Sequence, residues 1–288
     1  MSEPVVAGAR ASGSSTARRS DGTLRVLTAL VGLPLVIGAV WMGGWVLAGL
    51  ITLVCVIAQR EFYLLAKAAG TNPKSVWGLA AGACVALHAL WPEGPLVALL
   101  LGVVYFCTTP FRNDRSHPLL DVAATFAGVV YPTAMLSTVV TLRVFLERVL
   151  PGDEPFWTTL TVFLLIFATD TVAYYAGRAF GRHPLAPRVS PKKTWEGAIG
   201  GVLGAGAAAA ALKMTVLPSV PWGAVAALAA VAAFVSPLGD LAESRLKRSV
   251  GVKDSGNILP GHGGLHDRFD ALTVAAPLAY VVLRVALA

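Results

Sequence analysis

Long apolar stretches alternate with short polar ones along most of the chain. A helix needs about 20 apolar residues to cross the hydrocarbon core of a membrane. Windows of that kind predict nine membrane-spanning helices, at roughly 24–43, 44–66, 75–91, 95–109, 121–143, 156–177, 195–217, 220–241 and 269–287. The third and fourth are short, and a re-entrant pair there would leave the downstream topology unchanged. The expected fold class is therefore all-α, a polytopic helical bundle within the membrane.

Composition points the same way. Of 288 residues, 56% are hydrophobic and only 14% are charged, whereas a typical soluble domain has about 25% charged residues. Residues 1–23 are small, polar and basic, so we expect a disordered cytoplasmic tail there. We expect N-terminal membrane helices over 24–150 and a C-terminal catalytic membrane region over 151–288.

The lysines and arginines predict the orientation, because basic residues favour the cytoplasmic side. With the N-terminus in the cytoplasm, all but four of the 23 lie in cytoplasmic segments; the exceptions are Arg143, Arg148, Lys213 and Arg284. The net charge of +7 suits contact with anionic lipid headgroups of the bilayer. Nucleic acid would also attract this charge, but no aromatic-and-basic recognition module is present in the sequence, so no nucleic-acid partner is expected.

One carboxylate, Asp170, lies deep within the sixth apolar run. An acid at bilayer depth is costly and is a functional candidate by default. Tyr174 and Gly177 follow at i+4 and i+7 and share its helix face. The alternative is that Asp170 forms an ion pair with a basic residue of a neighbouring helix and serves only packing. Of the two, a functional role for Asp170 is favoured.

The segment RVSPKKTWEG, at 188–197, predicts a helix start. Ser190 is the expected N-cap and Pro191 the first helical residue, which places Lys192 and Lys193 in the first turn. Cations at a helix N-terminus interact unfavourably with the helix dipole, and a bound anion would offset this cost. The pair therefore indicates either a phosphate site or two ordinary membrane-flanking lysines.

Four glycines follow in two overlapping G-x-x-x-G spacings, at 197 and 201 and at 200 and 204. This spacing permits close contact between helices. Packing within the chain or a homodimer seam would each explain it better than chemistry.

The densest polar stretch runs from 236 to 270. Asp240, Glu243, Ser244 and Lys247 lie at i, i+3, i+4 and i+7 and therefore share one helix face. Pro237 leaves the carbonyl of residue 233 without its helical donor and can bend the helix beside Asp240.

Two further acids, Asp267 and Asp270, begin the last apolar helix, after a Pro-Gly-His-Gly-Gly turn. Carboxylate oxygens suit Mg²⁺, which often bridges to substrate phosphates, and glycines let backbone N–H groups approach a phosphate. A zinc site is disfavoured because the five histidines are scattered. A solvated charged loop is the alternative, and it explains poorly why the acids stand at helix ends.

These residues resemble the signature of the phosphatidate cytidylyltransferases (CDP-diacylglycerol synthases). The similarity runs through Ser244-x-Leu246-Lys247-Arg248, then Lys253-Asp254, then Ile258-Leu259-Pro260-Gly261-His262-Gly263-Gly264-Leu265-x-Asp267-Arg268-Phe269-Asp270. The Asp170 helix, the loop 190–197 and Gly239-Asp240-x-x-Glu243-Ser244 resemble the same family in the same order. The likeness is specific over about 165–270.

The resemblance implies that CTP and phosphatidic acid react to give CDP-diacylglycerol and pyrophosphate at the cytoplasmic face of the inner (plasma) membrane. It implies Mg²⁺, and sometimes a second cation such as K⁺. The lipid phosphate would attack the α-phosphorus of CTP in line, with a metal held by Asp240 and Asp267 neutralising the developing charge.

Roles for individual residues follow from the resemblance. The implied catalytic residues are Asp240, Asp267, Lys253, Asp254 and His262. The implied metal ligands are Asp240, Asp267, Asp170, Glu243 and Asp270. The implied substrate-binding residues are Ser190, Lys192, Lys193, Ser244, Lys247, Arg248, Gly263, Gly264 and Arg268.

Two other functions compete. A CTP-dependent polyprenol or phytol kinase would transfer the γ-phosphoryl group and release CDP. An ion or metabolite transporter would use Asp170, Asp240 and Asp267 as coupling acids within the membrane. Against a transporter, no inverted repeat is visible and the polar motifs crowd into the second half of the chain.

Overall fold

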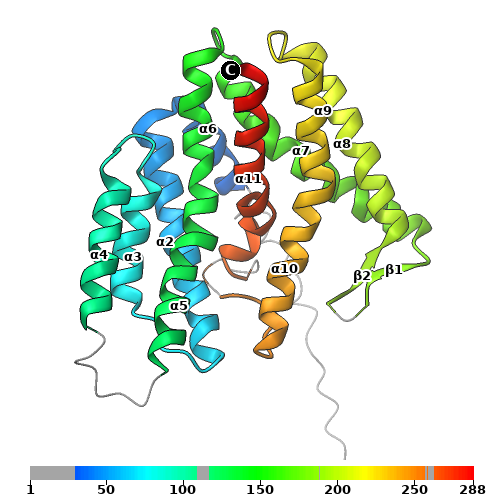
Figure 1. The fold of residues 1–288 in the computed structure, drawn as a ribbon. Helices are drawn as coiled ribbons and strands as arrows, with labels where there is room; N and C mark the ends of the chain where they lie inside the picture. The colour runs from blue at the N-terminus through cyan, green and yellow to red at the C-terminus, as the bar shows by residue number, and fades with distance from the viewer. Residues whose placement is uncertain (1–29, 109–116, 188, 257, 259–262) are drawn as a thin grey trace, which may run out of the picture.

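The computed structural model describes residues 30–108, 117–187, 189–256, 258 and 263–288. Helices lie side by side along the length of the molecule, and a small two-stranded ribbon projects near one end (Figure 1). The all-α fold class is therefore confirmed. The predicted tail at 1–23 lies outside the described residues.

The elements follow one another as a bundle with one interruption by strands. In chain order they are α2 (Gly44–Ala68), α3 (Ser75–Ala86), α4 (Gly94–Thr108), α5 (Pro118–Gly128), η2 (Val129–Ala134), α6 (Met135–Val149), α7 (Glu154–Phe180), β1 (Pro184–Ala186), β2 (Ser190–Thr194), α8 (Trp195–Thr215), α9 (Trp222–Ala230), η3 (Val231–Val235), α10 (Ser236–Ser249) and α11 (His266–Leu287). A further apolar helix, Leu30–Met42, precedes α2.

Six helices are long and apolar enough to cross a membrane by length and composition: Gly44–Ala68, Pro118–Val149, Glu154–Phe180, Trp195–Thr215, Trp222–Ser249 and His266–Leu287. Every predicted apolar run corresponds to a helix. However, α3 has 12 residues and α4 has 15, which is less than the roughly 20 that a crossing requires. The count of nine crossings therefore stays a prediction.

Two of the long helices contain a π-helical segment beside a proline. In the first, η2 contains Pro132. In the second, η3 ends directly before Ser236 and Pro237, the start of α10. A proline removes one backbone donor, and a wider turn accommodates the loss. The irregularity predicted near Asp240 is therefore present, one turn before that residue.

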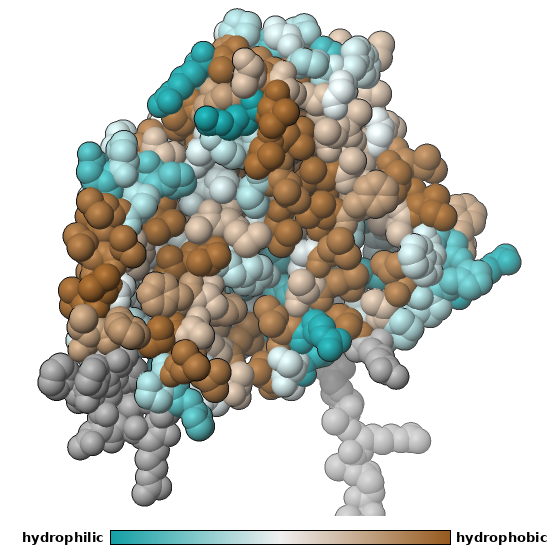
Figure 2. All heavy atoms as spheres, in the orientation of Figure 1, coloured by the Kyte–Doolittle hydropathy of each residue, from teal (hydrophilic) through white to brown (hydrophobic). Residues whose placement is uncertain are grey.

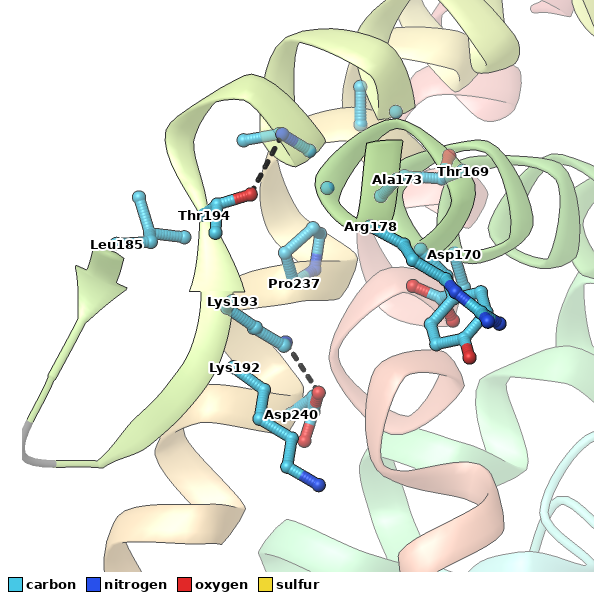
Figure 3. Close-up of a pocket in the computed structure, with 16 residues that line it drawn as sticks. Thr169, Asp170, Ala173, Arg178, Leu185, Lys192, Lys193, Thr194, Pro237 and Asp240 are labelled. Atoms are coloured by element: carbon cyan, nitrogen blue, oxygen red, sulfur yellow. Dashed lines mark hydrogen bonds and ion pairs between the residues drawn. The ribbon is translucent and has the colours of Figure 1, made fainter. Parts of the chain in front are cut away.

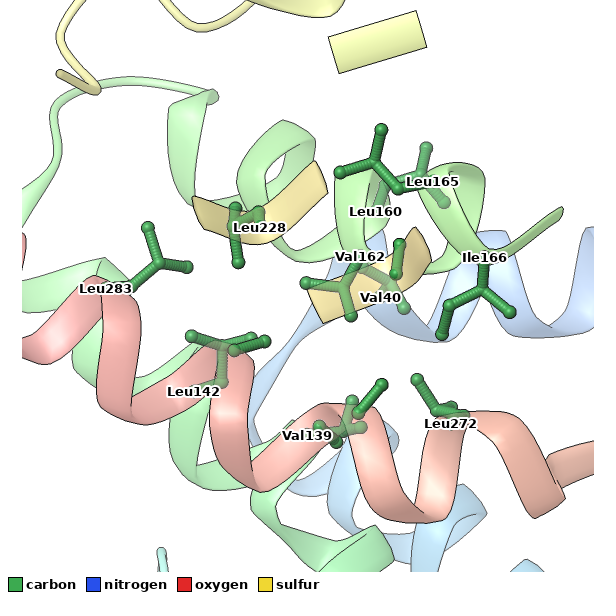
Figure 4. Packing of buried hydrophobic residues seen from close by; sticks show 14 of the residues in the cluster. Val40, Val139, Leu142, Leu160, Val162, Leu165, Ile166, Leu228, Leu272 and Leu283 are labelled. Carbon is green, nitrogen blue, oxygen red and sulfur yellow. The ribbon is translucent and has the colours of Figure 1, made fainter. Parts of the chain in front are cut away.

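The apolar core lies where the first helix, α2, α6, α7, α9 and α11 meet (Figure 4). Its side chains come from elements far apart in the sequence, among them Val40, Leu142, Leu165, Leu228 and Leu283. Apolar side chains also cover much of the outer face, while hydrophilic ones gather toward the two ends and at the ribbon (Figure 2). Such extensive exposed apolar surface is typical of a protein that contacts membrane.

The glycine face of α8 packs against α7. A Cβ at Gly204 would lie 2.6 Å from Val172 Cγ2, and Gly201 and Gly197 lie directly against Thr169 and Ala173. The G-x-x-x-G spacings are thus used within the chain, where small residues let two helices approach closely. A homodimer stays a prediction.

Candidate active site

The lysine pair lies on a strand. Ser190–Thr194 forms β2, paired antiparallel with β1, and α8 begins at Trp195. The predicted helix start with Ser190 as N-cap is therefore wrong: Thr194 is the N-cap, and its Oγ1 accepts a hydrogen bond from the Gly197 N–H at 3.2 Å. Pro191 has no N–H to donate, which an edge strand tolerates. Strand pairing thus replaces the expected first turn of a helix.

The ribbon is fastened to α8 by Glu196, near the start of that helix. Its Oε2 accepts from the Arg182 N–H at 3.1 Å, and its Oε1 lies 2.6 Å from His183 Nδ1. This anchoring fixes the position from which Lys192 and Lys193 project.

A first cavity, of about 400 Å³, lies between α7, the ribbon, α8 and α10 (Figure 3). Four predicted site residues line it: Asp170, Lys192, Lys193 and Asp240. Lys193 from β2 and Asp240 from α10 point toward each other, with Nζ 2.5 Å from Oδ2. Arg178 of α7 also lines this cavity; sequence analysis had treated it only as one more basic residue. Three cations that line one cavity, from the ribbon and from α7, suit a polyanionic ligand such as a phosphate chain.

A second cavity, of about 700 Å³, begins at the same acids. Its polar end is formed by Asp170, Asp240, Asp267, Arg268 and Asp270. The rest of its wall is apolar and comes from the first helix, α7 and α11, including Leu33, Val36, Ile37, Leu160, Phe163, Leu164, Ile166 and Phe167.

Asp170 and Asp240 line both cavities, which therefore meet at these two residues. Asp170 is exposed at the cavity walls. Among the described residues, no lysine or arginine forms an ion pair with it within 4 Å. The alternative of a packing ion pair therefore finds no support in the described part of the chain.

Lys247 of α10 lies between Glu243 of the same helix and Asp267 of α11. Its Nζ lies 3.1 Å from Glu243 Oε1 and 2.5 Å from Asp267 Oδ1. Glu243 has 0% of its surface exposed and Lys247 has 7%. Buried charges are tolerated when they are paired. Through Asp267, Lys247 holds the start of α11 against α10.

Two backbone N–H groups that precede α11 also donate hydrogen bonds to Asp267. Its Oδ2 accepts from the N–H groups of Ser255 and Gly264, each at 3.0 Å. Gly263 has φ +81°, a left-handed conformation that glycine adopts readily. The N–H of Gly264, predicted to bind substrate, is thus already engaged by Asp267 in this structure.

The remaining predicted residues divide into three groups. Ser244 Oγ donates to Asp240 Oδ1 at 3.3 Å, which places it beside the cavities. Ser190, Arg248, Lys253 and Asp254 line neither cavity; Arg248 is exposed and donates to the Val252 carbonyl at 2.9 Å. His262 lies outside the described residues.

A carboxylate that sequence analysis missed, Glu61 of α2, also belongs to this region. It has 0% of its surface exposed and accepts hydrogen bonds from Ser255 Oγ at 3.1 Å, Leu265 N at 3.0 Å and His266 N at 2.8 Å. The rule that singled out Asp170, a carboxylate within an apolar run, applies equally to Glu61 and would have found it.

The chemistry of the acids that line the second cavity fits Mg²⁺. Asp170, Asp240, Asp267 and Asp270 offer only oxygen donors to the second cavity. In the described segments, however, no three or more His, Cys, Asp or Glu side chains form a group that could hold a metal ion, so the five predicted ligands are not gathered into one cage. Mg²⁺ usually uses one or two carboxylates, with waters and substrate phosphates completing its shell. The site fits an ion of that kind.

Comparison with known proteins now gives the class. A model of the Cytidylyltransferase family matches residues 23–286, so the chain belongs to that family, and the resemblance in its motifs is confirmed. A phosphatidate cytidylyltransferase of Brucella abortus (strain 9-941) is 37% identical over 270 residues, covering 89% of this chain and 91% of the relative. The phosphatidate cytidylyltransferase of Synechocystis is 31% identical over 285 residues, with 90% and 95% covered. Chloroplastic phosphatidate cytidylyltransferase 4 of Arabidopsis thaliana is 32% identical over 286 residues, with 89% and 72% covered.

Proposed function

We propose that this chain transfers the cytidylyl group of CTP to phosphatidic acid, giving CDP-diacylglycerol and pyrophosphate. The observation that carries the proposal is the meeting of a basic cavity with an apolar cavity at Asp170 and Asp240. A reaction that joins a polyanionic nucleotide to a membrane lipid needs both kinds of cavity, open to one reacting point. The names of the relatives support the same reaction.

The first cavity takes the nucleotide in this proposal. Lys192, Lys193 and Arg178 line it, and charge-assisted hydrogen bonds from such groups are the strong ones for phosphate. Its volume of about 400 Å³ lies in the usual range for a small-molecule site, about 300–1,000 Å³. When the triphosphate binds, Lys193 would exchange Asp240 for a phosphate oxygen.

The second cavity takes the lipid. An acyl chain would lie along the apolar wall of Val36, Phe163 and Phe167. The lipid phosphate would then stand at the polar end, where Arg268 supplies a guanidinium. This placement brings the lipid phosphate toward Asp170 and Asp240, where the nucleotide cavity opens.

In the reaction, a phosphate oxygen of the lipid attacks the α-phosphorus of CTP. The bond from that phosphorus to the oxygen bridging to the β-phosphate breaks, and pyrophosphate leaves with the electron pair. A phosphate monoester is already anionic at neutral pH, so no general base is required. The side chains therefore act by positioning the two phosphates and balancing their charge. A Mg²⁺ ion held by Asp240 and Asp267 would supply further charge neutralisation at the phosphates; a second cation such as K⁺ stays a prediction.

We infer that the site faces the cytoplasm, in the inner (plasma) membrane. Lys67 in the last turn of α2 and Lys247 and Arg248 in the last turn of α10 are at the end where the ribbon lies (Figure 1). Arg178 in the last turn of α7 and Lys192 and Lys193 of the ribbon add to that end. The opposite end carries Arg148, Lys213 and Arg284, in the last turns of α6, α8 and α11. The greater number of basic residues at the ribbon end supports a cytoplasmic location for it.

The position of a radioactive label tests the reaction. Purified protein in detergent would receive phosphatidic acid, Mg²⁺ and CTP labelled at either the α- or the γ-phosphate. We expect the α-label in the lipid product and the γ-label in pyrophosphate. A γ-label in the lipid would instead establish a CTP-dependent kinase and overturn the proposal.

A further inference from the structure

The start of α11 depends on a residue about two hundred positions earlier in the chain. The first N–H groups of a helix have no partner within the helix, and the N-cap residue of α11, Leu265, makes no side-chain cap. Glu61 of α2 accepts the N–H of Leu265 at 3.0 Å and that of His266 at 2.8 Å. A carboxylate there is also favoured by the helix dipole. Glu61 therefore caps α11 from another helix.

The same carboxylate is connected to Asp267 through Ser255. The hydroxyl of Ser255 donates to Glu61 Oε2 at 3.1 Å, while its backbone N–H donates to Asp267 Oδ2 at 3.0 Å. Gly264 is the second connection: it donates its N–H to Asp267 at 3.0 Å, and a Cβ at this position would lie 2.8 Å from Glu61 Oε2. Both backbone donors to Asp267 thus belong to residues beside Glu61: Ser255 donates its hydroxyl to Glu61, and Glu61 leaves no room for a side chain at Gly264.

We propose that Glu61 is a positioning residue that holds Asp267 in its reactive orientation by fixing Ser255, Gly264 and the first turn of α11. The kinetic part of this inference rests on the proposed function. A carboxylate is required because three donors converge on it. A glutamine would direct its own NH₂ group at one of them and leave that donor without an acceptor. Loss of that hydrogen bond would shift the first turn of α11, and Asp267 lies in this turn.

The test is Glu61→Gln, with Glu154→Gln as matched control. Glu154 is likewise a buried carboxylate that accepts the N–H and the hydroxyl of one serine, Ser219, at 3.0 and 2.6 Å. It begins α7, at the end of the bundle away from the ribbon (Figure 1). Both variants lose a buried carboxylate with similar partners, and only one is connected to Asp267.

Hydrogen exchange of the intact protein in detergent, without substrate or metal, gives the first readout. The amides of Ser255 and Gly264 donate to Asp267 and not to Glu61. We expect Glu61→Gln to accelerate exchange at these two amides as well as at Leu265 and His266. Acceleration confined to Leu265 and His266 would mean a local helix cap and would overturn the proposal. This readout stands whether or not the chain makes CDP-diacylglycerol.

Turnover gives the second readout. Partners that orient a reactive group typically contribute about 10- to 100-fold to activity. We expect kcat per folded molecule to fall by that factor in Glu61→Gln and to stay within about twofold in Glu154→Gln. Equal losses in the two variants would assign Glu61 to stability alone. An inactive wild-type protein would instead contradict the proposed function, leaving the exchange readout to decide on Glu61.

A milder variant covers the case in which Glu61→Gln does not fold. Ser255→Ala removes one hydrogen bond to Glu61 and keeps the backbone donor to Asp267. We expect faster exchange at the amides of residues 255 and 264, and a smaller fall in kcat. Unchanged exchange and unchanged kcat would refute the connection.

Discussion

Two lysines pair with three acids of the candidate site. Lys193 pairs with Asp240, and Lys247 lies between Glu243 and Asp267. Without these ammonium groups the acids would repel one another across the cavities. Substrate phosphates would compete for the same lysines, so each pair is a contact that binding can exchange. Charge at these positions should therefore affect catalysis more than stability.

The first prediction concerns Asp267→Asn. The amide keeps the size of the side chain and one oxygen for the N–H groups of Ser255 and Gly264, but it loses the charge that faces Lys247. Removing one preorganised electrostatic group commonly costs about 100- to 1,000-fold in kcat, and we expect a loss of that order. The assay is CDP-diacylglycerol formation at saturating CTP. Asp153→Asn, at an exposed residue preceding α7, serves as control. Near-normal turnover of Asp267→Asn at ordinary Mg²⁺ would exclude Asp267 from the reaction centre.

The second prediction concerns Lys193→Met. A hydrogen bond to a charged group contributes about 1.5–3 kcal/mol, and 1.4 kcal/mol corresponds to about tenfold in affinity. We therefore expect the KM for CTP to rise roughly tenfold or more, with the KM for phosphatidic acid little changed. Arg245→Met, at an exposed residue of α10, is the control for loss of a positive charge in the same region. A rise confined to the KM for phosphatidic acid would contradict the proposal, because it would place the lipid, and not the nucleotide, in the first cavity.

At the residue scale, the motifs predicted Asp170, Lys193, Asp240 and Asp267 together because their side-chain chemistry is visible in the sequence. Glu61 was missed because the rule that singled out Asp170, a carboxylate within an apolar run, was not applied to it. Its role as a cap of α11 could not be predicted from the sequence, because its partners lie about two hundred positions away. Roles that depend on distant backbone donors are not encoded in any local spacing.

Among the elements, α7 and α8 form the scaffold of the first cavity. The glycine face of α8 keeps the two helices close, with Gly201 against Thr169 and Gly197 against Ala173. Asp170 lies on α7, and α8 directly follows the strand that carries the lysines. The distance between these helices therefore sets the width of the cavity.

A larger residue on this face should separate the two helices. In Gly204→Leu the new side chain would meet Val172, since even a Cβ would lie 2.6 Å from its Cγ2. Overpacking costs about 1–3 kcal/mol, so we expect a lower Tm in detergent and reduced turnover. Gly206→Leu, on the same helix, is the matched control because nothing lies within 4 Å of its Cβ position. Equal Tm and turnover in the two variants would contradict the role of this contact.

The apolar runs predicted the helices well because bilayer thickness sets their length and hydropathy marks them. The strand β2 was not predicted, since Ser-Pro begins a helix as readily as it occupies an edge strand. The pairing of Ala186 with Ser190 and of Pro184 with Thr194 decided between them. That choice depends on a partner strand, which the pattern within 188–197 does not contain.

For the whole molecule, the first cavity lies beside the ribbon, and the second extends from the same acids along α7 and the first helix into the apolar bundle. An apolar cavity that begins at the first helix and ends at the acids gives a lipid a path from the membrane to the nucleotide. In the proposed orientation the ribbon end faces the cytoplasm, which would supply the nucleotide.

Sidedness can be measured with single cysteines in a background from which Cys55, Cys84 and Cys107 have been removed. Arg245→Cys marks the ribbon end and Asp153→Cys marks the opposite end; both residues are exposed. In intact cells we expect a membrane-impermeant maleimide to label position 153 only, and in inverted vesicles position 245 only, because basic residues favour the cytoplasmic side. The reverse pattern would place the site outside the cytoplasm.

The central claim is that nucleotide and lipid occupy separate cavities that meet at Asp170 and Asp240. An experimental structure with a non-hydrolysable CTP analogue, Mg²⁺ and phosphatidic acid tests it most directly. We expect the triphosphate beside Lys192 and Lys193, an acyl chain along Val36 and Phe167, and both reacting phosphates next to the two acids. Either ligand bound elsewhere, or the two phosphates held apart with Asp170 and Asp240 touching neither, would contradict the account.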